Sequence, residues 1–378
     1  MTTNAIERVK KAIDEIKAGK MVILVDDEDR ENEGDLTMAS EMVTEEAITF
    51  MATKACGLIC VTLVPERVAE LGLPMMVEDN QAPLGTAFTI SIEAAEGVTT
   101  GISASDRAKT IRVAADPTTG KNDIVSPGHI FPLRAMPGGV LQRTGQTEGS
   151  VDLARLAGLT PSGAICEIMK PDGTMARMPD LEAFAKEHDL IIVSIADLIE
   201  YRLQKDRLVE RVATREIELC GKSGKAVFTA HIYKAVPGVR RQEYVALTLG
   251  DVSDGEPVPC RGHLASIVDD VFGGKTRKNS PSLRDVIDAI IRRGRGVILY
   301  LPSRDTIEYD IKSSTGTAEN KPRTRDREGV IREYGIGAQI LLDLGIERLQ
   351  VISNNPHKLV GLEAFGFKFA EQITLEEV

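Results

Sequence analysis

The densest group of chemically capable side chains is the acidic segment at residues 26–35, where seven of ten residues are Asp or Glu. It follows directly on residues 21–25, a short apolar run typical of a buried strand. Carboxylate oxygens suit a hard cation such as Mg²⁺, and repulsion between neighbouring carboxylates can raise one pKa for acid or base work. A solvated acidic turn is the alternative, and it is the commoner explanation for an arbitrary acidic segment.

A second segment has the composition of an anion site. Residues 143–148 read Arg-Thr-Gly-Gln-Thr-Glu and precede a helical pattern that is clear from Val151. Gly lets the backbone approach a phosphate, Thr hydroxyls and helix-start amides donate to it, and Arg supplies a bidentate charge. A plain helix cap is the competing interpretation.

Two further residues stand in unusual surroundings. His129 lies between Pro127 and Pro132, which predicts a loop, and from composition alone a structural and a catalytic role are both open. Glu167 interrupts the apolar run at residues 164–169, where a buried carboxylate requires a hydrogen-bonding or charged partner, or has a functional role. A surface-facing position on an alternating strand is the other explanation for Glu167.

The elements around these residues alternate between helix and strand patterns. Helical spacing occurs at residues 5–17, 151–157, 180–187, 282–293 and 337–344, and strand-like runs at 21–25, 58–64, 88–92, 164–169, 225–235, 297–301 and 349–352. Residues 201–212 form a charged, helix-like stretch, and residues 303–329 a long polar loop or insert. We therefore predict two α/β domains: residues 1–205, a mixed sheet covered by helices, and residues 206–378, a smaller α/β unit.

The composition narrows the class of protein. The net charge of -11 disfavours binding to nucleic acid, and 4% aromatic residues without Trp argue against a base-stacking surface. No stretch approaches the ~20 apolar residues of a membrane span. Five cysteines without a CxxC pair predict reduced thiols, so we expect a cytoplasmic protein without nucleic-acid or membrane partners.

Taken together, four ordered blocks resemble 3,4-dihydroxy-2-butanone 4-phosphate synthase. They are residues 27–35, 100–107, 128–133 and 165–168, and the similarity extends over residues 5–203. The resemblance implies a lyase of riboflavin biosynthesis that converts ribulose 5-phosphate to the four-carbon ketone phosphate and formate. It also implies Mg²⁺, with Mn²⁺ as an alternative metal, and a homodimer with active sites at the subunit interface.

The resemblance also assigns roles to individual residues. His129, Glu167 and Asp35 match catalytic positions, and Glu31 and Gln146 match metal ligands. The substrate-binding positions are Arg30, Glu31, Glu33, Asp35, Arg143, Thr144, Gly145, Gln146, Thr147 and Glu167. Gln146 departs from the family pattern, which has His there; an amide oxygen can coordinate Mg²⁺ but cannot act as an imidazole base.

The second half resembles GTP cyclohydrolase II over residues 225–370, through blocks that include residues 261–263, 294–301 and 334–341. The positions of the three zinc-binding cysteines of that family appear as Ser266, Arg277 and Asn279, and Cys260 lies outside the matching spacing. Arg332 does match a functional arginine. We therefore expect a degenerate domain without zinc or cyclohydrolase activity. Two alternatives are a catalytically silent regulatory or scaffolding protein, with Gln146 as a sign of decay, and a bifunctional enzyme that holds zinc elsewhere.

Overall fold

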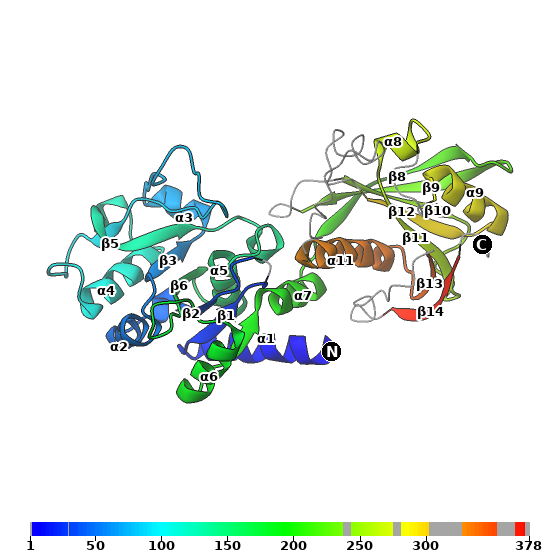
Figure 1. Ribbon diagram of the computed structural model, residues 1–378. Coiled ribbons are helices and arrows are strands. Elements are labelled where there is room, and N and C mark those ends of the chain that lie inside the picture. The colour runs from blue at the N-terminus through cyan, green and yellow to red at the C-terminus, as the bar shows by residue number, and fades with distance from the viewer. Residues whose placement is uncertain are drawn as a thin grey trace. The chain divides into compact units, whose positions relative to one another are not determined.

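The chain forms two compact units, Met1–Arg202 and Leu203–Val378 (Figure 1). The computed structural model describes residues 2–28, 30–236, 243–274, 281–301, 327–353 and 367–374. Each unit contains a mixed β-sheet with helices packed on it, and the prediction of two α/β domains is confirmed. Within the described residues, no helix is long and apolar enough to cross a membrane.

The first unit is built on a sheet with strand order β4-β5-β3-β6-β2-β1-β7. Its strands are β1 (Val22–Val25), β2 (Gly34–Ala39), β3 (Cys60–Leu63), β4 (Ile92–Ala94), β5 (Ile124–Arg134), β6 (Ser162–Glu167) and β7 (Ile192–Ser194). Its helices are α1 (Thr2–Lys17), α2 (Glu45–Phe50), α3 (Pro65–Glu70), α4 (Ala104–Ala115), α5 (Gln146–Leu156), α6 (Met178–His188) and α7 (Ile195–Lys205).

The two faces of this sheet are covered by different helices. Side chains of α2, α4 and α6, among them Ile48, Ile111 and Leu181, join strand residues such as Leu36 and Cys166 in one buried cluster. Helix α5 packs on the strands β6, β2 and β3 and also contacts α1. Because successive strand residues alternate between faces, Asp35 and Glu167 project away from Leu36 and Cys166, toward the side that α5 covers.

The second unit has strand order β14-β13-β11-β12-β10-β9-β8. Its strands are β8 (Val209–Cys220), β9 (Lys225–Ala235), β10 (Glu243–Leu249), β11 (Val258–Leu264), β12 (Gly296–Leu301), β13 (Arg348–Ile352) and β14 (Lys368–Ile373), and its helices are α8 (Ile267–Asp270), α9 (Leu283–Arg293) and α11 (Arg327–Asp343). Val286 and Ile290 of α9 pack against Phe228 and Ile298.

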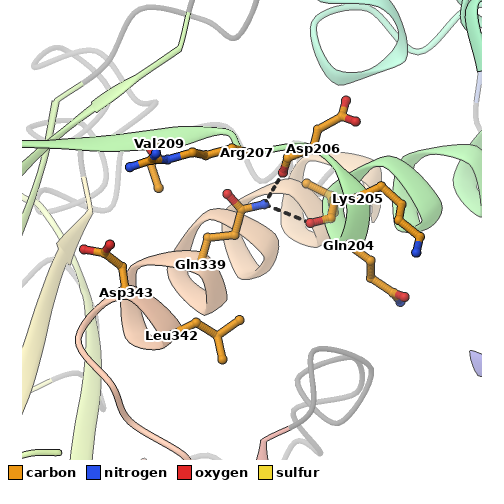
Figure 2. Close-up of a pocket in the computed structure, with 9 residues that line it drawn as sticks. Gln204, Lys205, Asp206, Arg207, Val209, Gln339, Leu342 and Asp343 are labelled. Carbon is orange, nitrogen blue, oxygen red and sulfur yellow. Dashed lines mark hydrogen bonds between the residues drawn. The ribbon is translucent and has the colours of Figure 1, made fainter.

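The side-chain amide of Gln339 in α11 binds backbone groups at the start of this unit (Figure 2). Gln339 Nε2 donates to the carbonyl oxygens of Leu203 and Asp206 at 2.9 and 2.7 Å, and its Oε1 accepts from the Leu208 amide at 2.8 Å. These bonds satisfy backbone groups that the end of a helix leaves without partners. A hollow of about 280 Å³ lies beside Gln339 and contains no residue of the expected site.

Three sequence-based assignments need correction. Residues 88–92 do not form a strand: Phe88 and Thr89 make isolated bridges, and β4 begins only at Ile92. The helix expected at residues 201–212 ends at Lys205, and the chain enters β8 at Val209 because long antiparallel pairing with β9 outweighs local helix propensity. Of the polar stretch at residues 303–329, residues 303–326 lie outside the described part, and the last three open α11.

Candidate functional site

The sheet register places two of the expected catalytic residues, Asp35 and Glu167, on one face. Asp35 of β2 lies directly opposite Glu167, the last residue of β6, and directly paired residues project to the same side. Cys60 of β3 pairs with both Ile165 and Phe131, and His129 lies two residues before Phe131 in β5. Glu167 Oε2 accepts from the Leu58 amide at 2.8 Å.

The paired carboxylates are electrostatically crowded. Burial, followed by the charges of Glu167 and Glu31, holds the pKa of Asp35 well above its usual value. Burial is also the main reason why the pKa values of Glu167 and Glu33 are raised. A group of this kind keeps a proton at higher pH than an ordinary carboxylate, so it can serve as an acid in one step and a base in the next.

Arg30 connects the acidic segment to helix α5. Its Nη1 donates to Asp26 Oδ2 at 2.7 Å, to Glu31 Oε2 at 3.0 Å and to Gln146 Oε1 at 2.9 Å. The Asp26 carboxylate also accepts from the backbone amides of Glu31 and Glu33 at 3.0 and 2.9 Å. The acidic segment is therefore an organised loop with an internal counter-ion, and not a solvated acidic turn.

Arg177 fixes the same loop from its other side. Its Nη1 donates to the carbonyl oxygen of Glu31 at 2.7 Å and also to that of Asn32, whose backbone is left-handed with φ 55°. Arg177 was not predicted from the sequence because its shortest contacts are to backbone atoms, which no side-chain pattern reveals.

The residues expected to bind phosphate lie at the start of α5. This helix begins at Gln146 with Gly145 as its N-cap, and Gly145 makes no side-chain cap bond. A Cβ at Gly145 would lie 2.5 Å from Arg143 Nη1, so only Gly allows the guanidinium to approach. Arg143 Nη1 donates to Glu148 Oε2 at 2.7 Å, and Thr144 and Thr147 flank the turn. Arg charge, a bare Gly and backbone amides at a helix start together suit an anion.

His129 is part of a strand and not of a loop. It belongs to β5, which pairs with β3 from Phe131 onward and with β4 at Ile124, Val125 and Ile130, and the prediction of a Pro/Gly loop is wrong. Its Nδ1 lies 2.8 Å from Oε2 of Glu93 in β4. Glu93 was missed because nothing in the sequence around it indicates a partnership with a residue 36 positions away.

The two side-chain oxygens expected to hold Mg²⁺ lie close to the same nitrogen atom. Glu31 Oε2 and Gln146 Oε1 both lie within 3.0 Å of Arg30 Nη1, and oxygen donors suit this metal. In the part of the chain that the structure describes, no three His, Cys, Asp or Glu side chains gather closely enough to hold a metal alone. Glu31 and Gln146 thus fit Mg²⁺, which commonly retains several water or substrate ligands.

In the second unit, the structure describes two residues that bear on zinc binding: Ser266, at an expected cysteine position, and Cys260. Ser266 caps α8 by accepting from the Asp269 amide, and burial raises the pKa of Cys260 to about 12. Arg277, Asn279 and the side chain of Arg332 lie outside the described residues. His263, Asp270 and Tyr300 form a hydrogen-bonded group in the same unit. His263 Nε2 lies 2.8 Å from Asp270 Oδ1, and the Tyr300 hydroxyl donates to Asp270 Oδ2 at 3.2 Å.

Comparison with known proteins matches this two-part organisation. The family model described as 3,4-dihydroxy-2-butanone 4-phosphate synthase matches residues 10–201, and the model described as GTP cyclohydrolase II matches residues 210–374. Riboflavin biosynthesis protein RibBA of Aquifex aeolicus (strain VF5) is 47% identical over 97% of this chain and 92% of that protein.

Two solved structures are also similar. RibBX, a two domain 3,4-dihydroxy-2-butanone 4-phosphate synthase from A. baumannii, is 39% identical with a TM-score of 0.77, covering 97% of this chain and 99% of that one. A 3,4-dihydroxy-2-butanone 4-phosphate synthase in complex with two magnesium ions is 42% identical with a TM-score of 0.50, covering 52% of this chain and 97% of that one.

The fold and the site define a two-domain α/β protein whose first domain carries a cluster of carboxylates with raised pKa values and, at the start of α5, a Gly N-cap next to Arg143. The chain belongs to the family of riboflavin biosynthesis proteins in which a 3,4-dihydroxy-2-butanone 4-phosphate synthase domain is joined to a GTP cyclohydrolase II domain.

Proposed function

We propose that the first domain converts ribulose 5-phosphate to 3,4-dihydroxy-2-butanone 4-phosphate and formate, and that this is the only activity of the chain. The observation that carries the proposal is the direct pairing of Asp35 with Glu167 between β2 and β6. The carbon balance of the reaction closes, since five carbons become four plus one and no external oxidant is required. The work left for the protein is proton transfer and charge stabilisation, which these side chains can perform.

The residues divide this work by their positions. Arg143 and the amides at the start of α5 would bind the phosphate, while Arg30 and Glu33 would contact the sugar hydroxyls beside the acidic loop. Asp35 and Glu167 would exchange protons with the carbon chain between them and His129. Mg²⁺ held by Glu31 and Gln146 would stabilise negative charge on the enediolate oxygens when bound.

We further propose that the second domain lacks GTP cyclohydrolase II activity. Ser266 stands at an expected cysteine position and acts as a helix cap, and the burial of Cys260 favours its neutral thiol over the thiolate that zinc requires. The domain would then stabilise or regulate the first. The description of RibBX as a two domain synthase is consistent with such an arrangement.

A second copy of the chain would complete the site. Large apolar side chains are exposed on the segments that border it: Leu58, Met76, Val77, Leu84, Ile102 and Val125. Leu58 and Ile102 directly follow glycines that touch Glu167 and Glu93. Exposed apolar surface of this kind marks an interaction site, so a homodimer is proposed. Val125→Lys should convert the dimer to a monomer in light scattering, and an unchanged mass would contradict this interface.

The test of the proposed activity is formate release from ribulose 5-phosphate, with and without Mg²⁺. Glu31→Ala and Glu167→Ala should each abolish metal-dependent release, whereas Glu96→Ala, at an exposed position, should leave it intact. Retained release in both site variants would indicate a contaminant. No release from folded wild-type protein would make the silent regulatory interpretation the leading one. Formate release from GTP would overturn the assignment of a single activity.

A further inference from the structure

We propose that Glu93 is a positioning residue that holds His129 in the tautomer with its proton on Nδ1, which leaves Nε2 free to accept a proton. This inference deepens the proposed function and rests on it, because His129 is an expected catalytic residue of that reaction. Glu93 itself stands behind the ring and acts through His129.

The contacts around Glu93 leave it little freedom. Its Oε2 accepts from the His129 backbone amide at 3.2 Å and faces His129 Nδ1 at 2.8 Å. Its Oε1 accepts at 2.8 Å from the Thr110 hydroxyl of α4, which also faces the Asp106 carbonyl oxygen at 2.9 Å and accepts from the Ala94 amide at 3.1 Å. The carboxylate is therefore held at both oxygens, with one oxygen aimed at the ring.

The Glu93 and His129 side chains differ in their exposure to solvent. The Glu93 side chain is 10% exposed, whereas that of His129 is 45% exposed. Since Nδ1 faces the buried carboxylate, the remaining ring nitrogen, Nε2, is left for the open side. In the proposed arrangement the Glu93 carboxylate is the acceptor of this contact and Nδ1 the donor, so the neutral ring carries its lone pair on Nε2.

Gly101 makes room for the pair. A Cβ at this residue would lie 1.9 Å from Glu93 Oε2 and 2.5 Å from His129 Nδ1, and its φ of +89° also favours Gly. The loop is anchored by Asp106, whose Oδ2 accepts from the Gly101 amide at 3.0 Å. The Gly101 backbone therefore packs directly against the Glu93 carboxylate and the His129 ring, and this packing restricts rotation of both side chains.

Two interpretations of Glu93 must be separated. If Glu93 served only to pin β4 to α4 through Thr110, its loss would change stability but not the location of the ring proton. If it positions His129, the tautomer and the turnover number should change together, while the substrate's phosphate contacts and KM remain nearly unchanged.

The experiment is a long-range ¹H–¹⁵N correlation spectrum of the histidine rings in the resting full-length protein, combined with steady-state kinetics. The chain has five histidines, and His129→Asn identifies the resonance of interest. Wild-type His129 should show its proton on Nδ1. Glu93→Leu, which removes both acceptors, should shift the proton toward Nε2 and lower kcat at least tenfold, with KM changed less than about twofold.

Glu93→Gln is the rescue variant, because its amide oxygen can still accept from Nδ1. It should keep the wild-type tautomer and retain more activity than Glu93→Leu. Glu96→Gln on the same segment is exposed and serves as the matched control. An Nε2-protonated ring in the wild type overturns the proposal even if Glu93→Leu fails to fold, and so does unchanged kcat in folded Glu93→Leu. Because the spectrum needs no turnover, failure of the proposed function would be recognised separately by absent formate release.

Discussion

Replacement of Gly101 by Ala tests the packing of the site with a closely matched control. Gly101 and Gly97 both have left-handed backbones, with φ of +89° and +75°. A Cβ at Gly97 would meet only Lys109 Cε at 3.5 Å, an ordinary contact, whereas one at Gly101 would lie 1.9 Å from Glu93 Oε2. Backbone strain is therefore common to both variants, and the steric clash is specific to Gly101→Ala.

The expected magnitudes follow from these contacts. Left-handed strain costs about 1–2 kcal/mol in each variant. The clash additionally forces Glu93 away from its two hydrogen bonds to His129, and bonds to a charged group are worth about 1.5–3 kcal/mol each. Because His129 is partly exposed, we expect a difference of about 3 kcal/mol between the variants. For a unit of this size that corresponds to about 6–12 °C in Tm.

Scanning calorimetry and formate release should be measured on both variants side by side. Gly101→Ala should unfold at the lower temperature and show the larger loss of kcat, while Gly97→Ala should retain nearly wild-type turnover. Equal Tm values and equal turnover for the two variants would refute the reasoning, since the clash would then be relieved without disturbing Glu93 and His129.

Three further predictions concern charge and metals. Asp35→Asn should abolish activity but stabilise the fold: the folded-state pKa of Asp35 is raised, so the wild type loses stability as pH rises above about 3.9, the ordinary Asp value. Urea unfolding without divalent metal should show the variant's advantage at pH 7 and none at pH 3. Gln146→His should increase Mg²⁺ affinity in titration calorimetry, and unchanged affinity would refute the placement of Gln146 at the metal. Elemental analysis of purified protein should find zinc far below one ion per chain, and stoichiometric zinc would instead support an active second domain.

Regular elements were predictable where the apolar pattern is continuous. The expected strand at residues 225–235 is β9 (Lys225–Ala235), and the pattern at residues 282–293 matches α9 (Leu283–Arg293) to within one residue. The pattern misled where two elements meet without a break, as at residues 201–212. There the decisive pairing of β8 with β9 is a tertiary contact that a local window cannot detect.

The geometry of the site was harder to predict from the sequence than the regular elements. The acidic segment and the glycine beside Arg143 were identified by composition, but the opposition of Asp35 and Glu167 depends on the register between β2 and β6. The contact of Arg30 with Gln146 spans 116 positions, and the pairing of Glu93 with His129 requires β4 and β5 to be neighbours. Sequence spacing contains no direct signal for any of these partnerships.

The guanidinium of Arg30 gives the acidic loop a tethered cation of its own. Because Nη1 bridges Asp26, Glu31 and Gln146, it offsets part of the loop's negative charge and orders the loop without a metal ion. On the proposed assignment of Glu31 and Gln146 as the residues that would hold Mg²⁺, the ion would take the place of the guanidinium between these two oxygens. Arg30 would then be released from Glu31 and Gln146 and could contact the substrate, so metal binding and the freeing of this side chain would be coupled.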